Sequence, residues 1–226
     1  MGEEDDPHGQ GFNRAAPPPA RGRPAWSAAN PGNRAIRAEA LAASRALAGD
    51  RLGPDGGRVL DAGCGTGWWL ASLIEVGHPA RHLWGVDRDP ARVTAAAARA
   101  PGAAVTAGDL LALPYDDDAF DVVLLMTVLS SVGSAERVRA ALGELRRVTA
   151  PGGMAIVFEP RVPTPNRTTR LIRTREVSAA YGPRTGARSV TLLPPLARRL
   201  PSAEAYARWA RVPLLRTHRV TRHARG

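Results

Sequence analysis

The densest group of residues suited to ligand chemistry lies at positions 59–69, where an apolar run ending in an acid leads into a glycine-rich turn. Asp61 closes the run Val-Leu-Asp-Ala. Three glycines then follow at alternate positions: Gly63, Gly65 and Gly67. Glycine lets a backbone turn sharply and approach a ligand without interference from a Cβ atom. The pattern predicts a buried parallel strand, a tight turn and a helix that begins near Thr66.

The spacing of the glycines indicates which ligand the turn could hold. It reads G-x-G-x-G, whereas G-x-G-x-x-G makes room for a pyrophosphate at a helix N-terminus. Asp61 adds negative charge just before the turn, so a nucleoside with a cationic tail fits better than NAD, and a dehydrogenase is disfavoured. Asp87 ends a second predicted strand, where doubly wound sheets carry the acid that binds ribose hydroxyls.

Apolar runs and helical patterns alternate along the rest of the chain, as they do in a doubly wound α/β fold. The expected strands cover residues 59–62, 82–87, 103–107, 120–127, 154–158, 187–193 and 213–220. The expected helices cover a segment ending at Asp50 and residues 66–77, 90–100, 135–149 and 171–181, and a further helix lies after the segment 194–200. Seven strands with helices on both faces of the sheet are therefore predicted.

Five motifs follow one another in a fixed order, at residues 61–67, 86–87, 108–110, 113–121 and 145–153. In this order they resemble the class I S-adenosylmethionine-dependent methyltransferases, and in particular the ubiquinone/menaquinone-biosynthesis group, often called methyltransferase type 11. The likeness extends from about residue 30 to the C-terminus. It implies a Rossmann-like sheet, mostly parallel with an antiparallel last strand, S-adenosylmethionine as cofactor and methyl transfer as activity.

The resemblance implies cofactor contacts at twelve positions: Asp61, Gly63, Cys64, Gly65, Thr66, Gly67, Asp87, Arg88, Asp109, Leu110, Met126 and Thr127. Asp61 and the glycine turn would hold the methionine part, and Asp87 would hold the ribose hydroxyls. Arg88 would lie along the adenosine. Asp109 would accept a hydrogen bond from the adenine amino group, near the backbone N–H of Leu110.

Catalytic groups are harder to identify from the sequence. Met126 and Thr127 would line the methyl-bearing side of the cofactor, where many relatives carry a histidine that segment 127–131 lacks. Methyl transfer is an in-line displacement that positioning alone accelerates strongly, so no base is strictly required. For a hydroxyl acceptor, Glu159 and His218 are the candidates for a general base.

Other conspicuous residues have simpler explanations. Cys64 is the only cysteine, which excludes an internal disulfide and favours a small filler of the turn over a nucleophile. The acids at 116–118 fit a solvated turn, and the five histidines have no ligand spacing, so no metal site is expected. Residues 1–25, rich in proline and acids, fit a disordered tail, which leaves residues 26–226 for the methyltransferase domain.

The basic charge is concentrated in one part of the chain. All 31 basic residues are arginines; residues 1–160 carry a net charge of −3 and residues 161–226 a net charge of +13. Few aromatic residues accompany these arginines, so a solvated face is favoured over an RNA groove, while an acidic substrate or partner stays open.

A signal peptide and a 20-residue apolar span are absent, which favours a cytoplasmic protein.

These observations favour methylation of a small biosynthetic intermediate on oxygen or carbon. The [DNS]-P-P-[FYW] signature of enzymes that methylate nucleobase amines is absent, so action on nucleic acid is disfavoured. Two alternatives remain: a cofactor-binding regulatory or scaffold protein without turnover, and an RNA methyltransferase that uses the arginine-rich end. The resemblance also implies a leading helix that covers the cofactor, which makes Trp26, Asn30 and Asn33 lid candidates; the alternative is that they are ordinary turn and cap residues. The acceptor and the oligomeric state stay open.

Overall fold

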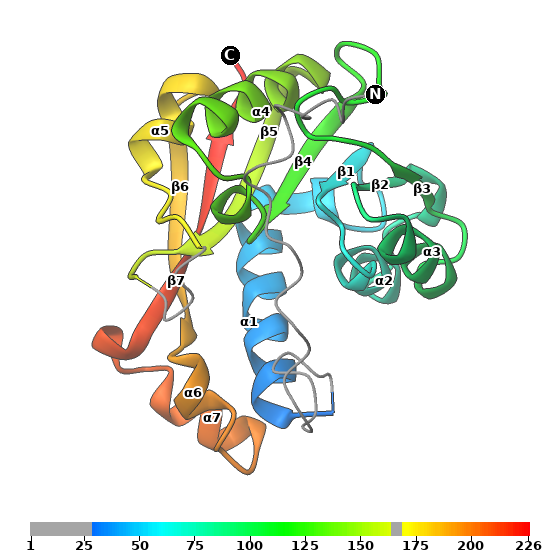
Figure 1. Cartoon of the computed structure of the whole chain (residues 1–226). Coiled ribbons are helices and arrows are strands. Elements are labelled where there is room, and N and C mark those ends of the chain that lie inside the picture. Colours follow the sequence, from blue (N-terminus) through cyan, green and yellow to red (C-terminus); the bar gives the residue numbers. More distant parts are fainter. Residues whose placement is uncertain (1–28, 164–168) are drawn as a thin grey trace, which may run out of the picture.

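The computed structural model describes residues 29–163 and 169–226, which fold around one seven-stranded sheet (Figure 1). The expected tail at 1–25 and Trp26 lie outside the described residues. The strands are β1 (Val59–Ala62), β2 (Leu83–Asp87), β3 (Ala104–Ala107), β4 (Phe120–Met126), β5 (Thr149–Pro160), β6 (Arg184–Leu192) and β7 (Arg216–Ala224). Their order is β3-β2-β1-β4-β5-β7-β6. The pairs from β3 to β5 are parallel, and β7 runs antiparallel to both its neighbours, which confirms the predicted fold class.

Helices cover both faces of this sheet. The longer ones are α1 (Pro31–Ala48), α2 (Trp68–Glu75), α3 (Pro90–Arg99) and α4 (Ala135–Val148), followed by the short α5 (Thr174–Ala180), α6 (Pro194–Ala197) and α7 (Ala203–Trp209). Side-chain caps fix several starts: Asn30, Asp89 and Ser134 each accept a hydrogen bond from the first turn that follows. None of the described helices is long and apolar enough to cross a membrane.

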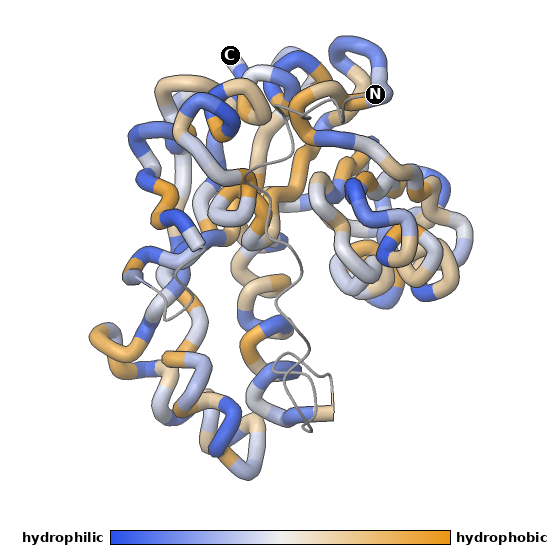
Figure 2. Tube along the Cα trace, viewed as in Figure 1, coloured by the Kyte–Doolittle hydropathy of each residue, from blue (hydrophilic) through white to orange (hydrophobic). Residues whose placement is uncertain are grey.

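Alternation along the central strands separates two apolar cores. Val122 and Leu124 of β4 pack with α1, α2 and α3, whereas Val123 and Leu125 pack with α4 and α5 on the other face. Figure 2 shows these strands as a mainly apolar centre of the molecule. Successive strand residues point to opposite faces, so one residue decides which helical layer a side chain meets.

Several predicted element boundaries differ from the structure. The second helix begins at Trp68 because Gly67, at φ 74°, is still in the turn. Strand β5 begins at Thr149, five residues before the prediction, because it pairs with Phe120 across a bulge that takes up the Pro-Gly-Gly segment. The segment that begins at Pro213 opens with a single 3₁₀ turn, η4 (Pro213–Leu215), before β7. Helix α5 is shorter than expected and begins at Thr174.

A third small core joins the C-terminal helices to α1. Ile36 of α1 packs with Leu192, Tyr206 and Ala210. Close approach is possible at Gly32, where an added Cβ would lie 2.0 Å from the carbonyl oxygen of Ala197. Helices α6 and α7 form the projection below the sheet in Figure 1.

Candidate functional site

Two adjoining hollows open at the carboxyl ends of the parallel strands, where such sheets bind ligands. The first, about 450 Å³, is lined by Gly63, Val86, Asp87, Arg88, Asp89, Pro90, Arg92, Gly108, Asp109, Leu110, Val128, Ser131 and Val132. The second, about 350 Å³, is lined by Ile36, Arg37, Gly63, Cys64, Gly65, Thr66, Trp68, Trp69, Asp87, Arg92, Met126, Thr127, Val128, Ser131, Phe158 and His218. Because the two hollows share Gly63 and Asp87, we treat them as one cleft. We call it the donor cleft, because the resemblance noted above implies that the methyl donor binds there.

The glycine turn forms the floor between the two hollows. All three glycines have positive φ: 76° at Gly63, 55° at Gly65 and 74° at Gly67. The N–H groups of Gly63 and Cys64 both donate to the carbonyl of Val86, at 2.8 and 2.9 Å, which ties the turn to β2. A Cβ added at Gly65 would meet no atom within 4 Å, so the turn presents open space there.

Asp61 lies buried beneath this turn without a hydrogen-bond partner. It is 0 % exposed, and both carboxylate oxygens lack a partner among the described residues. Burial, and then the nearby charge of Asp87, raise the pKa of Asp61 to about 7. A buried carboxylate with no donor is costly to ionise, so a cationic group or an ordered water at this point would stabilise it.

Asp87 holds the turn and also faces the cleft. Its Oδ2 accepts a hydrogen bond from the N–H of Gly65 at 2.9 Å, and its Oδ1 accepts one from the N–H of Asp89 at 3.0 Å. Each carboxylate oxygen has a second lone pair for a ligand hydroxyl. Arg88 lines the first hollow and is exposed.

The far side of the first hollow is the loop after β3. Asp109 accepts a hydrogen bond from the N–H of Leu111 at 3.0 Å, which shapes the loop, and its side chain is exposed. Leu110 is buried beside it and lines the hollow. A hydrogen-bond acceptor such as Asp109 can bind the edge of a planar ring, and the adjacent apolar surface of Leu110 can bind its face.

The second hollow ends in an aromatic wall formed by β5 and β7. Phe158 lies 5.1 Å from His218 between ring centroids, in a stacked arrangement, and Trp69 meets Phe158 edge-on at 6.3 Å. Burial lowers the pKa of His218 to about 4, so the imidazole is neutral at physiological pH. Its Nδ1 is 3.0 Å from the hydroxyl of Thr217.

Thr127, which directly follows β4, has a strained backbone conformation. Its φ is 61°, a region that a β-branched residue rarely adopts. Its N–H donates to the carbonyl of Phe158 at 2.7 Å, which holds the strain, and its exposed side chain lines the second hollow with Met126.

Two arginines at this end of the cleft were not predicted from the sequence. Arg37 of α1 lies over the ring of Trp68, 5.1 Å from its centroid, and burial, followed by the charge of Arg99, lowers its pKa. Arg99 donates to both the carbonyl and the hydroxyl of Thr66 at 2.6 Å. The spacing of Arg37 within an amphipathic helix gave no signal, since only the packing of α1 brings it to the turn.

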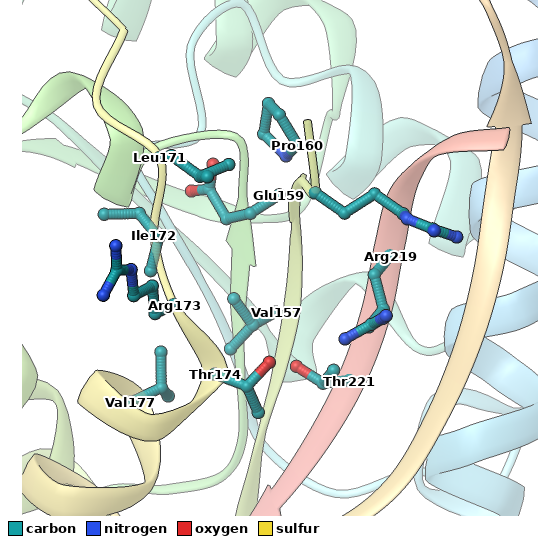
Figure 3. A pocket seen from close by; sticks show the side chains of 11 residues that line it. Val157, Glu159, Pro160, Leu171, Ile172, Arg173, Thr174, Val177, Arg219 and Thr221 are labelled. Atoms are coloured by element: carbon teal, nitrogen blue, oxygen red, sulfur yellow. The ribbon is translucent and has the colours of Figure 1, made fainter. Parts of the chain in front are cut away.

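Glu159 lies on the opposite face of the sheet from the donor cleft. Its neighbour Phe158 lines the cleft, and the alternation of β5 turns Glu159 toward α5 and a separate hollow of about 330 Å³. Figure 3 shows its carboxylate beside Leu171 and Ile172. Its Oε1 accepts a hydrogen bond from the N–H of Ser130 at 3.3 Å. Of the two candidate bases, the structure therefore brings only His218 into the donor cleft.

The other residues singled out in the sequence make contacts within the protein. Asn30 and Asn33 bond to Arg198 through its carbonyl and its Nε, both at 3.1 Å, and so join α1 to the C-terminal helices. Cys64 is buried, and burial raises its pKa. Asp117 and Asp118 form ion pairs with Arg147 and Arg225. No cluster of metal-ligating side chains occurs within residues 29–163 and 169–226.

The residues of the donor cleft fit a zwitterionic nucleoside. The orphaned carboxylate of Asp61 and the open surface of Gly65 suit a cationic amino-acid tail, while Arg37 offers a partner for its carboxylate. Asp87 suits a ribose, and the Asp109 loop suits a purine. This combination is compatible with S-adenosylmethionine as the ligand.

Comparison with known proteins finds a methyltransferase domain in this chain. Residues 59–153 match the model of a methyltransferase domain. A probable S-adenosylmethionine-dependent methyltransferase of Mycolicibacterium smegmatis is 36% identical over 126 residues, which cover 54% of this chain and 47% of that protein. A demethylmenaquinone methyltransferase of Mycobacterium bovis is 38% identical over 114 residues, covering 50% and 45%. The chain spans about half the length of the curated relatives it matches.

Solved structures share the fold. The N-methyltransferase NodS of Bradyrhizobium japonicum, in complex with S-adenosylhomocysteine, has a TM-score of 0.63 at 18% identity, with 91% of this chain and 93% of that one covered. Geranyl diphosphate C-methyltransferase of Streptomyces coelicolor has a TM-score of 0.59 at 18% identity, covering 81% and 76%. Residues 59–153 therefore carry a methyltransferase domain, and the motifs and fold of the chain are similar to those of S-adenosylmethionine-dependent methyltransferases, enzymes of menaquinone biosynthesis among them.

Proposed function

We propose that this protein transfers a methyl group from S-adenosylmethionine to an oxygen or carbon of a small biosynthetic intermediate. The proposal is carried by one observation: an unpartnered buried carboxylate, Asp61, lies under an open glycine turn whose cleft ends in an aromatic wall. The bound cofactor supplies an electrophilic methyl group on a sulfonium. The chain's own residues hold the donor, shape the space for the acceptor and exclude water.

We assign the donor contacts to the cleft residues as the resemblance implied. Asp61 binds the amino group of the methionine part, and the backbone around Gly65 supports it. Asp87 binds the ribose hydroxyls, Arg88 lies along the adenosine, and Asp109 accepts a hydrogen bond from the adenine. Helix α1, which brings Ile36 and Arg37 to the cleft, acts as its cover.

The acceptor binds against Phe158, Trp69 and His218, on the side where Met126 and Thr127 end β4. Aromatic walls suit an apolar, planar or prenyl-like acceptor. For a hydroxyl acceptor, His218 receives the proton, because its neutral imidazole can accept one at physiological pH. Relatives named as demethylmenaquinone methyltransferases are compatible with this acceptor class.

Calorimetry with S-adenosylhomocysteine and NAD tests the cofactor, and labelled methyl transfer into a cell extract tests turnover. We expect S-adenosylhomocysteine to bind, NAD to fail, and an extracted small molecule to acquire label. Tight NAD binding with no response to S-adenosylhomocysteine would contradict the assignment. Cofactor binding without any labelled product would instead favour a regulatory protein, and label in RNA would favour the RNA-modifying alternative.

His218→Asn separates a proton acceptor from a packing residue. An amide preserves most of the volume but cannot take up a proton, so turnover of a hydroxyl acceptor falls by about 10²-fold while cofactor affinity is unchanged. Val190→Ala, in the same core layer but outside the cleft, is the matched packing control. Equal losses in the two variants would show that His218 only packs.

A further inference from the structure

Large apolar side chains on the described surface gather at one place. Six are exposed in all. Four of them lie within residues 193–214, the stretch that includes α6, α7 and most of η4: Leu193, Trp209, Val212 and Leu214. We call these four residues the apolar tip. Leu214 is 95% exposed, which is close to the value for an isolated side chain, and Trp209 is 47% exposed. Exposed apolar groups that cluster in this way mark an interaction site more often than scattered ones do.

The apolar tip is one continuous structure. The N–H of Val212 donates to the carbonyl of Trp209 at 3.1 Å, and the N–H of Leu215 donates to the carbonyl of Val212 at 3.1 Å. The N–H of Leu193 donates to the carbonyl of Leu215 at 2.8 Å. Figures 1 and 2 show the turn at η4 as an apolar point at the lower left, apart from the glycine turn.

The turn is held from beneath by partly buried polar contacts. Nε of Arg216 donates to the carbonyl of Ala210 at 2.7 Å, while Arg216 also pairs with Glu39 at 3.2 Å. The hydroxyl of Tyr206 donates to Glu39 at 2.6 Å. The apolar side chains are therefore presented outward by a fixed support.

Arginines surround the apolar tip. Arg208 and Arg211 flank Trp209 and are exposed, and Arg199 is exposed in the preceding loop. From residue 177 to the C-terminus, Glu204 is the only acid beside ten arginines. The tip therefore combines exposed apolar side chains, a tryptophan and a rim of positive charge. This combination is typical of surfaces that bind at the interface of an anionic membrane.

We propose that the apolar tip and its flanking arginines dock this protein on an anionic lipid surface. The proposal goes beyond methyl transfer and does not rest on it. The charge pattern alone favoured a solvated face for the arginine-rich region. The proposal instead gives part of that charge a role in binding lipid. Two copies packed tip to tip would bring their arginines together, and one tryptophan offers RNA no series of stacking platforms, so charge and composition favour lipid.

Flotation of the full-length protein with vesicles tests the proposal. We expect co-flotation with vesicles of phosphatidylcholine and phosphatidylglycerol in equal parts, little with phosphatidylcholine alone, and a decline as salt rises. Leu214→Gln should weaken vesicle binding about tenfold, because the inserted side chain loses its apolar transfer energy. The double variant Arg208→Gln and Arg211→Gln should weaken it about 30-fold, from ~1 kcal/mol per arginine.

Matched controls separate a docking site from general charge and hydrophobicity. Leu171→Gln removes an exposed leucine elsewhere, and the double variant Arg51→Gln and Arg81→Gln removes two exposed arginines from the other end of the sheet. Both should float as the parent does, and melting temperatures should show that all variants fold. Calorimetry with S-adenosylhomocysteine on the tip variants should be unchanged, which keeps this result independent of the proposed function.

Three outcomes would overturn the proposal. The first is absence of flotation with the mixed vesicles at low salt. The second is equal binding by the tip and control variants. The third is a dimer, seen by light scattering without vesicles, that Leu214→Gln dissociates while vesicle binding is absent, since the tip would then be a contact between copies of this chain.

Discussion

Asp61 and Glu159 are two buried carboxylates near the carboxyl ends of strands in one sheet, and burial raises the pKa of each to about 7. They differ in what meets them. Neither oxygen of Asp61 has a partner, whereas Oε1 of Glu159 is held by the backbone of Ser130 and only its Oε2 is unpartnered. Asp61 lies under the donor cleft, while Glu159 faces the opposite helical layer.

A raised pKa therefore reports burial and does not by itself mark a ligand site. Glu159 connects β5 to the turn η3 (Leu129–Ser131), whose last residue lines the donor cleft, so its role is to position that turn. Asp61 has no such structural bond, and its unmet capacity points to a bound cation. Substitutions at the two acids should therefore have different effects.

The largest effect is expected from Asp61→Asn. Loss of the charge that pairs with the cofactor's amino group should weaken S-adenosylhomocysteine binding by about 2–3 kcal/mol, the value of a hydrogen bond to a charged group. Calorimetry measures it. Glu159→Gln is the matched control and should leave affinity within about twofold, a change of ~0.4 kcal/mol. Equal losses at both positions would remove the distinction between them.

A smaller effect is expected from Asp87→Asn. The amide keeps one acceptor but replaces the other oxygen with a donor, so either a ribose hydroxyl or the N–H of Gly65 loses its partner. Binding of S-adenosylhomocysteine should weaken by about 1–2 kcal/mol. Adenosine, which lacks the amino-acid tail, should lose affinity by the same factor with Asp87→Asn and should be insensitive to Asp61→Asn. The opposite pattern would exchange the two assignments.

The pH dependence of binding sharpens the comparison further. The pKa of Asp61 in the folded protein lies above its unfolded value of about 3.9, so ionisation costs the free protein stability as pH rises from that value through 7. A cationic ligand binds the ionised form, so affinity for S-adenosylhomocysteine should rise about tenfold between roughly pH 6 and 8. Asp61→Asn should abolish most of this rise. A rise retained in that variant would assign the titration to the ligand or to another residue.

The smallest effect is expected from Asp117→Ala in the acidic turn. Asp117 pairs with Arg147 at 2.8 Å, but its side chain is 73% exposed and Glu144 also holds this arginine at 2.8 Å. The free energy of unfolding should fall by less than about 1 kcal/mol, and cofactor affinity should not change. Chemical denaturation and calorimetry measure both. Loss of activity with a chelator, together with an inactive Asp117 variant, would instead indicate a metal site.

Much of the fold was predictable because its signals are local. The glycines at 63, 65 and 67 need positive φ, and the apolar run of β4 predicts a strand buried on both faces. The starts of α3 at Pro90 and of α4 at Ala135 were predicted correctly, and the structure shows that each directly follows a capping residue, Asp89 or Ser134. Boundaries were wrong where pairing overrode composition, as at Thr149, whose partner Phe120 lies far away in the sequence.

The strand–turn–helix unit around Asp61, the acid that ends β2 and the acid that follows β3 could all be recognised in the sequence, because each depends on neighbouring residues and on the period of a strand. Only the tertiary structure decided that His218 reaches the donor cleft, that Glu159 does not, and that Arg37 joins it. The antiparallel placement of β7 between β5 and β6 brings His218 against Phe158. Such contacts join residues far apart in the chain, and no local pattern encodes them.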